Sequence, residues 1–370
     1  MRPSWIQGVV VISLAVLASC RNTRIKFSCS QLVLDRIDPY IHLTSPLLPP
    51  QSTNTQASLI FPGVLGTPHL HQLVGGNSLN ATMDPADDRA SLSTCTSCTF
   101  PDDFSNYWTA VLYFRARNGT YKRVKQKTTP GFNDNARGGG TTVYYLAPAK
   151  NPTNIVAFKK GFRMRNGDPS ARDAASAARY RGIDFICLVE DDPRPTNRSP
   201  DFPDRMCPMG IITSVYFPPC WDGVNLDSPD HYSHVAWPAE GGFDEGGPCP
   251  ASHPVKIPQL ILEVRWDTSE FNDEGLWPED GSQPFVWSFG GDRTGLGGHG
   301  DYVFGWRGDS LQRAFSDEEE CLGWGNTRCE LPTQTVEAGN QCVVGQSVKE
   351  EVNGWLEKMP GGVVVDGVGI

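Results

Sequence analysis

The chain has 370 residues and a formal net charge of −10 at pH 7, and 20% of its residues are charged. A chain of this length can bury a large hydrophobic core. Its acidity argues against nucleic acid or an anionic membrane as a partner, and it is compatible with a neutral or cationic polysaccharide.

Residues 1–20 have the pattern of a signal peptide. Arg2 supplies a positive charge, and the run 9–18 is apolar apart from Ser13. This run is too short to span a bilayer stably, so the pattern predicts export and no membrane span. A lipobox that ends at Cys20 is the alternative, in which a lipidated cysteine anchors the chain.

Residues 21–345 are predicted to form one β-rich domain, with residues 41–60 as a loop insertion rich in Pro, Ser, Thr and Gln. The 38 Gly and 30 Pro residues break the chain into short segments. Segments rich in β-branched and aromatic residues between such breaks are typical of strands. We expect strands at 107–115, 141–146, 154–158, 185–189, 211–217, 259–266, 284–289 and 302–306.

Two helices are expected. The segment 170–180 is rich in Ala and Arg, and Ser170 is a candidate N-cap. A C-terminal helix over 346–359, with a tail to residue 370, is indicated by an apolar face at Val348, Val352, Trp355 and Leu356. Many strands with few helices predict a mainly β, single-domain sandwich or jelly roll with long loops.

Ten cysteines follow the predicted signal peptide. An even number in an exported chain predicts up to five disulfides, whose pairing the sequence does not reveal. The alternative concerns Cys95 and Cys98, whose spacing also suits half of a zinc site or a redox pair. The ten are Cys29, Cys95, Cys98, Cys187, Cys207, Cys220, Cys249, Cys321, Cys329 and Cys342.

Three tripeptides match the acceptor pattern for N-glycosylation. Such tripeptides arise often by chance, but three of them behind an export signal predict a glycoprotein. They begin at Asn80, Asn118 and Asn197, and Pro200 weakens the third.

His69 and His71 flank Leu70 in a segment rich in Gly and Pro. If this segment is extended, both imidazoles lie on one face, because side chains alternate along a strand. That geometry suits two metal ligands or a base and its helper. The alternative is a loop whose histidines form hydrogen bonds with carbonyl groups.

A second polar cluster lies between Cys220 and His234. A sugar site uses such a mixture, with an aromatic platform for the ring, carboxylates for the hydroxyls and a proton carrier. The alternative is a disulfide-linked loop with polar surface groups. The cluster consists of Trp221, Asp222, Asp227, Asp230, His231, Tyr232 and His234.

A third motif pairs His299 with Asp301 across Gly300. The glycines around it let the backbone approach a ligand closely. The motif is typical of a base with an orienting carboxylate. Of the other histidines, His253 is expected to cap a turn and His42 to be solvated.

Nine motifs occur in order along the chain. They are Arg36-Ile37-Asp38-Pro39, Phe61-Pro62-Gly63, His69-Leu70-His71-Gln72-Leu73-Val74-Gly75-Gly76, Cys95-Thr96-Ser97-Cys98, Asp103-Phe104-Ser105-Asn106-Tyr107-Trp108, Tyr144-Tyr145, Cys220-Trp221-Asp222-Gly223, His231-Tyr232-Ser233-His234-Val235-Ala236 and Gly295-Leu296-Gly297-Gly298-His299-Gly300-Asp301. The set resembles the DUF1996 family, a domain of unknown function in secreted fungal proteins, some of which carry WSC carbohydrate-binding domains. The resemblance covers about residues 30–345 and implies secretion and a cell-wall or polysaccharide setting, without a mechanism.

We therefore expect a secreted protein that acts on polysaccharide, either as a glycoside hydrolase or as a polysaccharide lyase. The alternative is a non-catalytic carbohydrate-binding or cell-wall protein. The candidate catalytic residues are His69, His71, His234, His299, Asp301 and Asp222. The candidate substrate-binding residues are Trp221, Asp230, Tyr232 and Trp108. The candidate cofactor is a divalent metal held by His69, His71 and His234.

Overall fold

The computed structural model describes residues 23–37, 65–67, 69–80, 83–129, 132–147, 155–189, 197–243, 246–316, 321–322 and 330–365. The expected signal peptide, the insertion 41–60 and His42 lie outside these residues. The described chain is mainly β with few short helices, which confirms the expected fold class. None of the described helices is long and apolar enough to cross a membrane.

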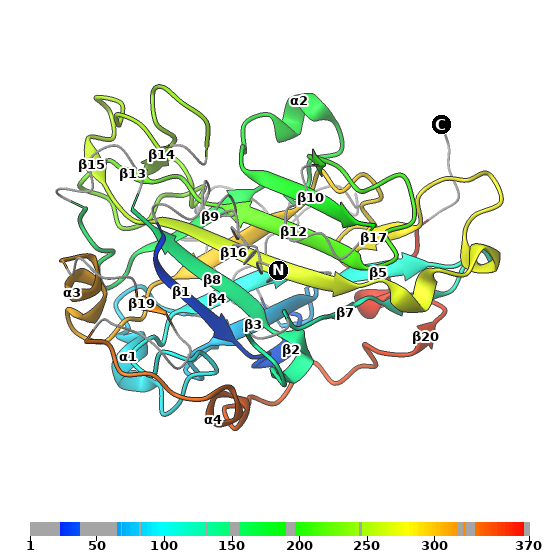
Figure 1. Ribbon diagram of the computed structural model, residues 1–370, viewed down its shortest axis with the longest axis horizontal. Helices are drawn as coiled ribbons and strands as arrows, with labels where there is room; N and C mark the ends of the chain where they lie inside the picture. The colour runs from blue at the N-terminus through cyan, green and yellow to red at the C-terminus, as the bar shows by residue number, and fades with distance from the viewer. Residues whose placement is uncertain are drawn as a thin grey trace, which may run out of the picture.

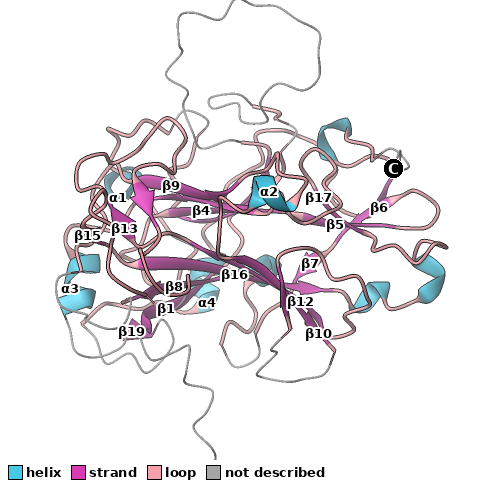
Figure 2. Ribbon diagram, turned by 90° about the horizontal axis from the view of Figure 1, so that it is seen from above, coloured by secondary structure: helices cyan, strands magenta, loops and turns pink. Residues whose placement is uncertain are grey.

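Two large, mainly antiparallel sheets lie face to face (Figure 2). The eight-stranded sheet has the order β11-β10-β12-β16-β8-β1-β19, and β7 also pairs with β16. Its strands are β1 (Thr23–Cys29), β7 (Lys125–Gln126), β8 (Thr141–Leu146), β10 (Ile183–Leu188), β11 (Arg198–Ser199), β12 (Gly210–Tyr216), β16 (Gln259–Asp267) and β19 (Cys321–Leu322). Within it, β19 pairs with β1 in parallel.

The second layer is a five-stranded sheet with the order β2-β3-β4-β18-β9. Its strands are β2 (Val33–Asp35), β3 (His71–Gly75), β4 (Asn106–Ala110), β9 (Arg163–Gly167) and β18 (His299–Val303). Alternation along these strands sends one set of side chains towards the other sheet, including Val74, Tyr107, Met164 and Tyr302. Those side chains form the main hydrophobic core together with Val143, Tyr145 and Leu262 of the large sheet.

Two small sheets complete the molecule (Figure 1). A four-stranded sheet contains β5 (Leu112–Arg115), β6 (Tyr121–Arg123), β17 (Phe285–Trp287) and β20 (Trp355–Leu356), and a three-stranded sheet contains β13 (Cys220–Trp221), β14 (Val235–Ala236) and β15 (Val255–Lys256). The single strand expected at 107–115 is in fact two strands, β4 and β5, which separate at Val111 and join different sheets. Apolar residues fill both faces of this segment because each half is covered on both sides.

The α-helices are α1 (Arg89–Leu92), α2 (Ala174–Ala177), α3 (Ser310–Ser316) and α4 (Val336–Asn340), and the 3-10 helices are η2 (Arg137–Gly139), η3 (Ser269–Phe271), η4 (Glu274–Leu276) and η5 (Pro360–Gly362). The helix expected at 170–180 is reduced to α2, and its N-cap is Asp173, not Ser170. The strand expected at 302–306 begins earlier, as β18, and residues 155–158 are not in a strand.

The predicted C-terminal helix is wrong. In place of a helix over 346–359, the chain is irregular and then forms β20, in which Trp355 pairs with Lys122. Tertiary contacts take the backbone groups that a helix would use, since Tyr113 donates its hydroxyl to the carbonyl of Val352 at 2.9 Å. Gly354, with φ of +76°, also breaks helical geometry just before β20.

Four disulfides join the described cysteines: Cys29–Cys98, Cys95–Cys342, Cys187–Cys207 and Cys220–Cys249. Cys321 is also disulfide-bonded, and Cys329 lies outside the described residues. Because Cys95 and Cys98 pair with different partners, their spacing marks neither a redox pair nor half of a zinc site.

Candidate metal centre

Three histidines are brought together by the register of the five-stranded sheet. His71 on β3 lies opposite Ala110 on β4. Gly300 on β18 lies opposite Thr109, so His299 flanks Ala110 on the other side. Residues that lie opposite each other on paired strands share a face. The methyl group of Ala110 is small enough for the two imidazoles to meet above it.

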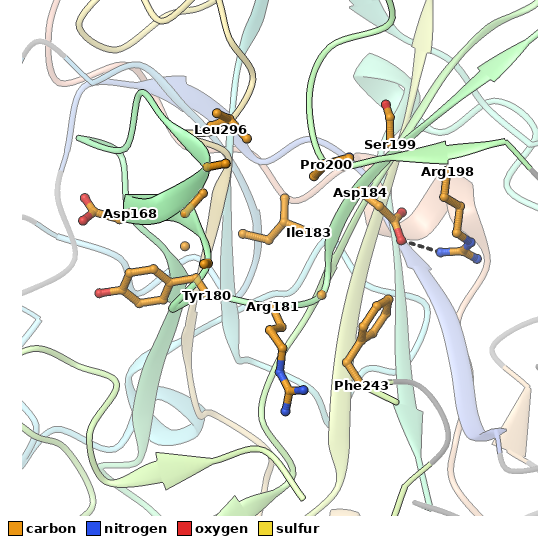
Figure 3. Close-up of a pocket in the computed structure, with 15 residues that line it drawn as sticks. Asp168, Tyr180, Arg181, Ile183, Asp184, Arg198, Ser199, Pro200, Phe243 and Leu296 are labelled. Carbon is orange, nitrogen blue, oxygen red and sulfur yellow. Dashed lines mark hydrogen bonds and ion pairs between the residues drawn. The ribbon is translucent and has the colours of Figure 1, made fainter. Parts of the chain in front are cut away.

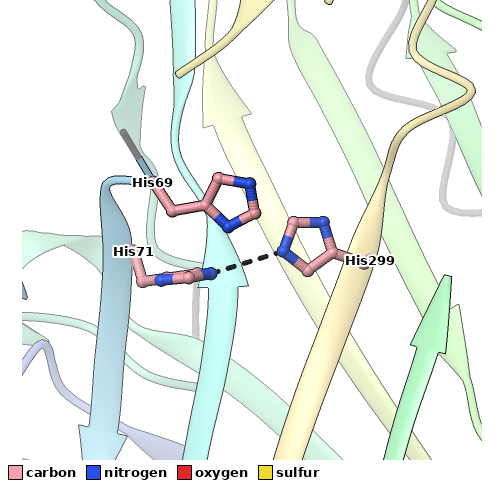
Figure 4. A group of neighbouring side chains, drawn as sticks. All are labelled: His69, His71 and His299. Carbon is pink, nitrogen blue, oxygen red and sulfur yellow. Dashed lines mark hydrogen bonds between the residues drawn. The ribbon is translucent and has the colours of Figure 1, made fainter. Parts of the chain in front are cut away.

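His69 joins them from the segment that leads into β3. It lies two residues before His71, ahead of the strand, and its ring packs against both of the other rings. The ring centroid of His69 is 5.2 Å from that of His71 and 5.3 Å from that of His299. Figure 4 shows the three rings converging on one point. We call His69, His71 and His299 the histidine trio.

The trio offers one ligand atom per ring, and these atoms all lie within 4.8 Å of one another. Nε2 of His71 is 3.3 Å from Nε2 of His299. Two nitrogens bound to a tetrahedral Zn²⁺ at about 2.05 Å are themselves about 3.3 Å apart. The spacing therefore fits two ligands of one zinc ion.

A backbone carbonyl fixes the tautomer of His299. Its Nδ1 is 3.1 Å from the carbonyl oxygen of Gly297. Since a carbonyl only accepts, Nδ1 carries the proton and Nε2 keeps a lone pair that points at His71. Metal-binding histidines are commonly oriented by such a bond through the other ring nitrogen.

The trio is held in the neutral form. All three residues are buried: His69, His71 and His299 are 2%, 1% and 3% exposed. Burial lowers the pKa of His71 to about 4. Burial, followed by the charge of neighbouring histidines, holds the pKa of His69 and of His299 well below the usual range. A neutral imidazole is the form that binds a metal.

Two charged residues and one ring surround the trio. A carboxylate oxygen of Asp301 lies 3.9 Å from Nε2 of His71. Arg165 on β9 lies opposite Asp301 and its charge further lowers the pKa of His69 and His299. Phe289 packs against both of these histidines, with centroid distances of 4.9 and 4.7 Å. The trio is therefore bordered by an apolar ring on one side and by one buried carboxyl group and one buried guanidinium group.

Unsatisfied polar atoms mark the same place. Nε2 of His69 is buried and has no hydrogen-bond partner among the described residues. Arg165 is 7% exposed, and its Nε and Nη1 also lack partners within the described chain. Buried polar groups are almost always paired. Unpaired donors and lone pairs on two adjacent residues favour a ligand between them.

His234 does not join the trio, which corrects the expectation. Its Nε2 donates to the carbonyl of Arg163 at 2.9 Å, and its Nδ1 contacts Ser228 at 2.8 Å. Arg163 is four residues from Gly167, the partner of His299, or roughly 13 Å along β9 at a rise of about 3.3 Å per residue. His234 is thus a satisfied buried histidine that fixes a loop.

The other members of that cluster also have structural roles. Asp222 accepts hydrogen bonds from the backbone of Val224 and Asn225, and Asp230 from that of Tyr232 and Ser233. Both carboxylates therefore cap turns, and neither lies at the trio.

The expected sugar platforms are corrected as well. Trp108, Trp221 and Tyr232 are 0%, 4% and 8% exposed, so none presents a ring face to a sugar. Trp221 uses its indole N–H to fix a loop by donating to Asn225 at 2.6 Å. His253, in contrast, binds the carbonyl of Ser233 at 3.0 Å, which suits the turn role expected for it.

A pocket of about 450 Å³ is lined mainly by the segment from the end of β9 to β10 (Figure 3). Its lining includes Gly167, which pairs with His299, and Leu296, but none of the three histidines. Its walls are mainly apolar, and an ion pair of 2.6 Å between Asp184 and Arg198 lies at one side.

Sequence reasoning missed Ala110, Arg165 and Phe289. The small residue between two histidines is visible only once the strand register is known. Arg165 alternates with buried Met164 in β9, a pattern that resembles an ordinary exposed strand face. Phe289 carries no polar atom and gives no signal of its own.

A family model described as "Domain of unknown function (DUF1996)" matches residues 58–306. The matched region contains all three histidines of the trio. No curated protein and no solved structure matches the chain.

Proposed function

The chain belongs to the DUF1996 family, and we propose that its histidine trio binds one divalent transition-metal ion, for which Zn²⁺ is the best fit. One observation carries the proposal, namely three neutral imidazoles with ligand atoms within 4.8 Å of one another. Three histidines and an open fourth position form the ligand set of a catalytic zinc site. Bound Zn²⁺ supplies Lewis-acid chemistry and lowers the pKa of water.

Two residues of this chain would support such chemistry. Arg165 has unpaired guanidinium N–H groups that can donate to a substrate oxygen as it gains negative charge. Asp301, beside His71, can accept a proton or orient the imidazole. The depressed pKa of each histidine keeps protons from competing with the metal at neutral pH.

We propose a polysaccharide as the substrate, cleaved by hydrolysis or by a lyase reaction outside the cell. The net charge of −10 favours a neutral or cationic polymer over an anionic one. Four described disulfides are typical of a protein in an oxidising compartment, which supports secretion to the extracellular space or cell wall.

A second candidate is a structural metal, and the burial of the trio favours it. Structural zinc sites are closed by four protein ligands, whereas catalytic sites keep one position open. Asp301, 3.9 Å from His71, is the residue that could close the site. In that case the protein would be a metal-stabilised carbohydrate-binding or wall protein without turnover.

Chelation separates the two candidates. The protein is freed of metal, reconstituted with Zn²⁺, and tested for cleavage of a polysaccharide panel and for thermal unfolding. A metal bound in either role raises Tm, because it stabilises the folded state by about 3 kcal/mol at a free concentration 100-fold above Kd. A catalytic metal also restores cleavage, whereas a structural metal raises Tm without any cleavage. Identical cleavage and identical Tm with and without Zn²⁺ would reject both.

A further inference from the structure

The turn between β5 and β6 holds an N-glycosylation acceptor in a fixed geometry. Ala116 donates its N–H to Thr120, and Gly119 donates its N–H to Ala116, both at 2.8 Å. Gly119 has φ of +86°, which glycine adopts readily. Asn118 lies at the tip of this tight hairpin with its side chain exposed.

The acceptor side chains are already ordered. Oδ1 of Asn118 accepts hydrogen bonds from the hydroxyl of Thr120 at 2.7 Å and from its N–H at 3.1 Å. These bonds use the carboxamide oxygen and not Nδ2, the atom that carries a glycan, and the residue as a whole is exposed. The tripeptide thus combines the required residue types with an accessible turn.

An exposed tryptophan stands beside this turn. Trp355 is 45% exposed, and it lines a cavity of about 520 Å³ together with Asn118 and Thr120. β20 holds Trp355 opposite Lys122, whose ammonium lies 5.4 Å from the indole. Phe271 supports the ring edge-on at a centroid distance of 6.4 Å.

The cavity has the composition of a sugar site. One aromatic face lies among polar groups, since Arg117, Asn118 and Thr120 share its lining with Trp355. Ring faces of sugars pack on aromatic side chains while their hydroxyl groups bind polar neighbours. The volume lies within the range that small ligands occupy.

We infer that Asn118 carries an N-linked glycan and that its first sugar packs on Trp355. Nδ2 forms a bond to C1 of N-acetylglucosamine, loses one proton, and displaces the diphosphate of a lipid-linked oligosaccharide donor, with no redox change. A tethered sugar has a high effective concentration at the cavity, so it occupies this site ahead of a free saccharide. This inference does not depend on the metal centre.

The packing has a structural consequence. Asn118 belongs to the β5–β6 hairpin, whereas Trp355 belongs to the C-terminal segment that adds β20 to the edge of the same sheet (Figure 1). β20 contributes only two residue pairs to that edge. A sugar that contacts both parts therefore fastens the C-terminal segment to the hairpin.

The test is a cycle of four variants of the full chain, secreted from a eukaryotic host. Thr120→Ser keeps the acceptor and its hydroxyl, whereas Thr120→Ala removes it, and each is made with Trp355 and with Trp355→Leu. Peptide mass spectrometry should find the glycan on Asn118 in Thr120→Ser only. Loss of the glycan should lower Tm by about 2–4 °C when Trp355 is present. In the Trp355→Leu background, removal of the glycan should leave Tm almost unchanged.

Three outcomes would overturn the inference, two of them in the variant cycle itself. One is an unmodified Asn118 in the Thr120→Ser protein. Another is an equal fall in Tm in both backgrounds, which would mean that the glycan acts without Trp355. Free chitobiose gives a second readout. It should bind to Thr120→Ala, but neither to the glycosylated protein, whose tethered sugar fills the cavity, nor to Thr120→Ala with Trp355→Leu. Equal binding by glycosylated and unglycosylated protein would contradict it.

Discussion

Each imidazole of the trio is held in place by a neighbour that has little chemistry of its own. Gly297 sets the tautomer of His299 through its carbonyl. Ala110 leaves the space that His71 and His299 share. Phe289 excludes polar groups from one side. Burial then lowers the pKa of each ring, which favours three neutral imidazoles with ligand atoms within 4.8 Å of one another.

A substitution of Asp301 tests whether its carboxylate belongs to the metal centre. Asp301→Asn removes the charge beside His71, and we expect Zn²⁺ affinity to fall roughly 10- to 100-fold, as for partners of metal-binding histidines. A competition titration with a fluorescent chelator measures the change. Asp309→Asn is the matched control, because Asp309 is exposed and pairs only with Arg313 among the described residues. Equal affinities for both variants would remove Asp301 from the site.

At this scale, a spacing of two residues predicts that His69 and His71 share a face if their segment is extended, and the structure brings their ring centroids to 5.2 Å. His299 is also identified, by a Gly-rich motif. His234 shows the limit of the approach. Its motif contains carboxylates and aromatic rings, but the hydrogen bond to Arg163 that satisfies it comes from a distant strand. Burial of Trp108 and Trp221 likewise depends on tertiary packing that spacing does not encode.

Among the elements, the pairing of β9 with β18 positions His299. Gly167 lies opposite His299 and has φ of +106°. A Cβ placed there would lie 2.2 Å from the carbonyl oxygen of Gly298 and 2.6 Å from Cα of His299. At this position the backbones of β9 and β18 therefore approach too closely for any residue that has a Cβ.

Gly167→Ala should destabilise the protein and weaken its metal binding together. The positive φ and the clash predict a loss of about 1–3 kcal/mol in the free energy of unfolding, with a shift of β18 that displaces His299. Chemical denaturation gives the first quantity and Zn²⁺ titration the second. Gly345→Ala is the control, because nothing lies within 4 Å of a Cβ at that position. Unchanged zinc affinity in Gly167→Ala would mean that this pairing does not position His299.

Several of the longer strands, such as β8, β12 and β16, could be predicted because β-branched and aromatic residues between Gly and Pro define them locally, whereas β1, β3 and β9 were not expected. The division into β4 and β5 could not, since both halves have the same composition and differ only in their partners. The false C-terminal helix has the opposite cause. A periodic apolar face is present, but Asp35 accepts hydrogen bonds from the backbone of Ser347 and Val348, which ties that segment to β2.

On the scale of the whole molecule, the two layers approach closely and enclose a polar chain within the core. A Cβ at Gly300 would lie 3.2 Å from Cγ1 of Val215 and 3.4 Å from Cδ1 of Leu262, so β18 packs directly on side chains of the large sheet at this position. Deeper in the core, Tyr107 donates to Asp103 at 2.7 Å and contacts the hydroxyl of Tyr145 at 2.7 Å. The trio lies on the opposite face of the same sheet.

Asp103 should make stability depend on pH. Burial raises the pKa of Asp103 from 3.8 to about 6. The folded state binds this proton more tightly than the unfolded state, so its contribution is fully present below about pH 4 and is lost as pH rises through 6. The full change is about 3 kcal/mol. The buried histidines act in the opposite sense over the same range, since their lowered pKa values make stability rise with pH. The measurement is therefore the difference in free energy of unfolding between the unmodified protein and Asp103→Asn, which cannot ionise, and this difference should fall between pH 4 and 7. A difference that stays constant over this range would remove Asp103 as a source of pH dependence.

The central claim is that one metal ion sits among three histidines, and metal stoichiometry tests it most directly. The protein, His71→Ala, His299→Ala and the control His253→Ala are stripped of metal, equilibrated with Zn²⁺, desalted and measured by elemental mass spectrometry. We predict about one zinc per chain in the unmodified protein and in His253→Ala, and close to none in the two trio variants while they remain folded by circular dichroism. No retained zinc in the unmodified protein, or equal zinc in all four, would contradict the account.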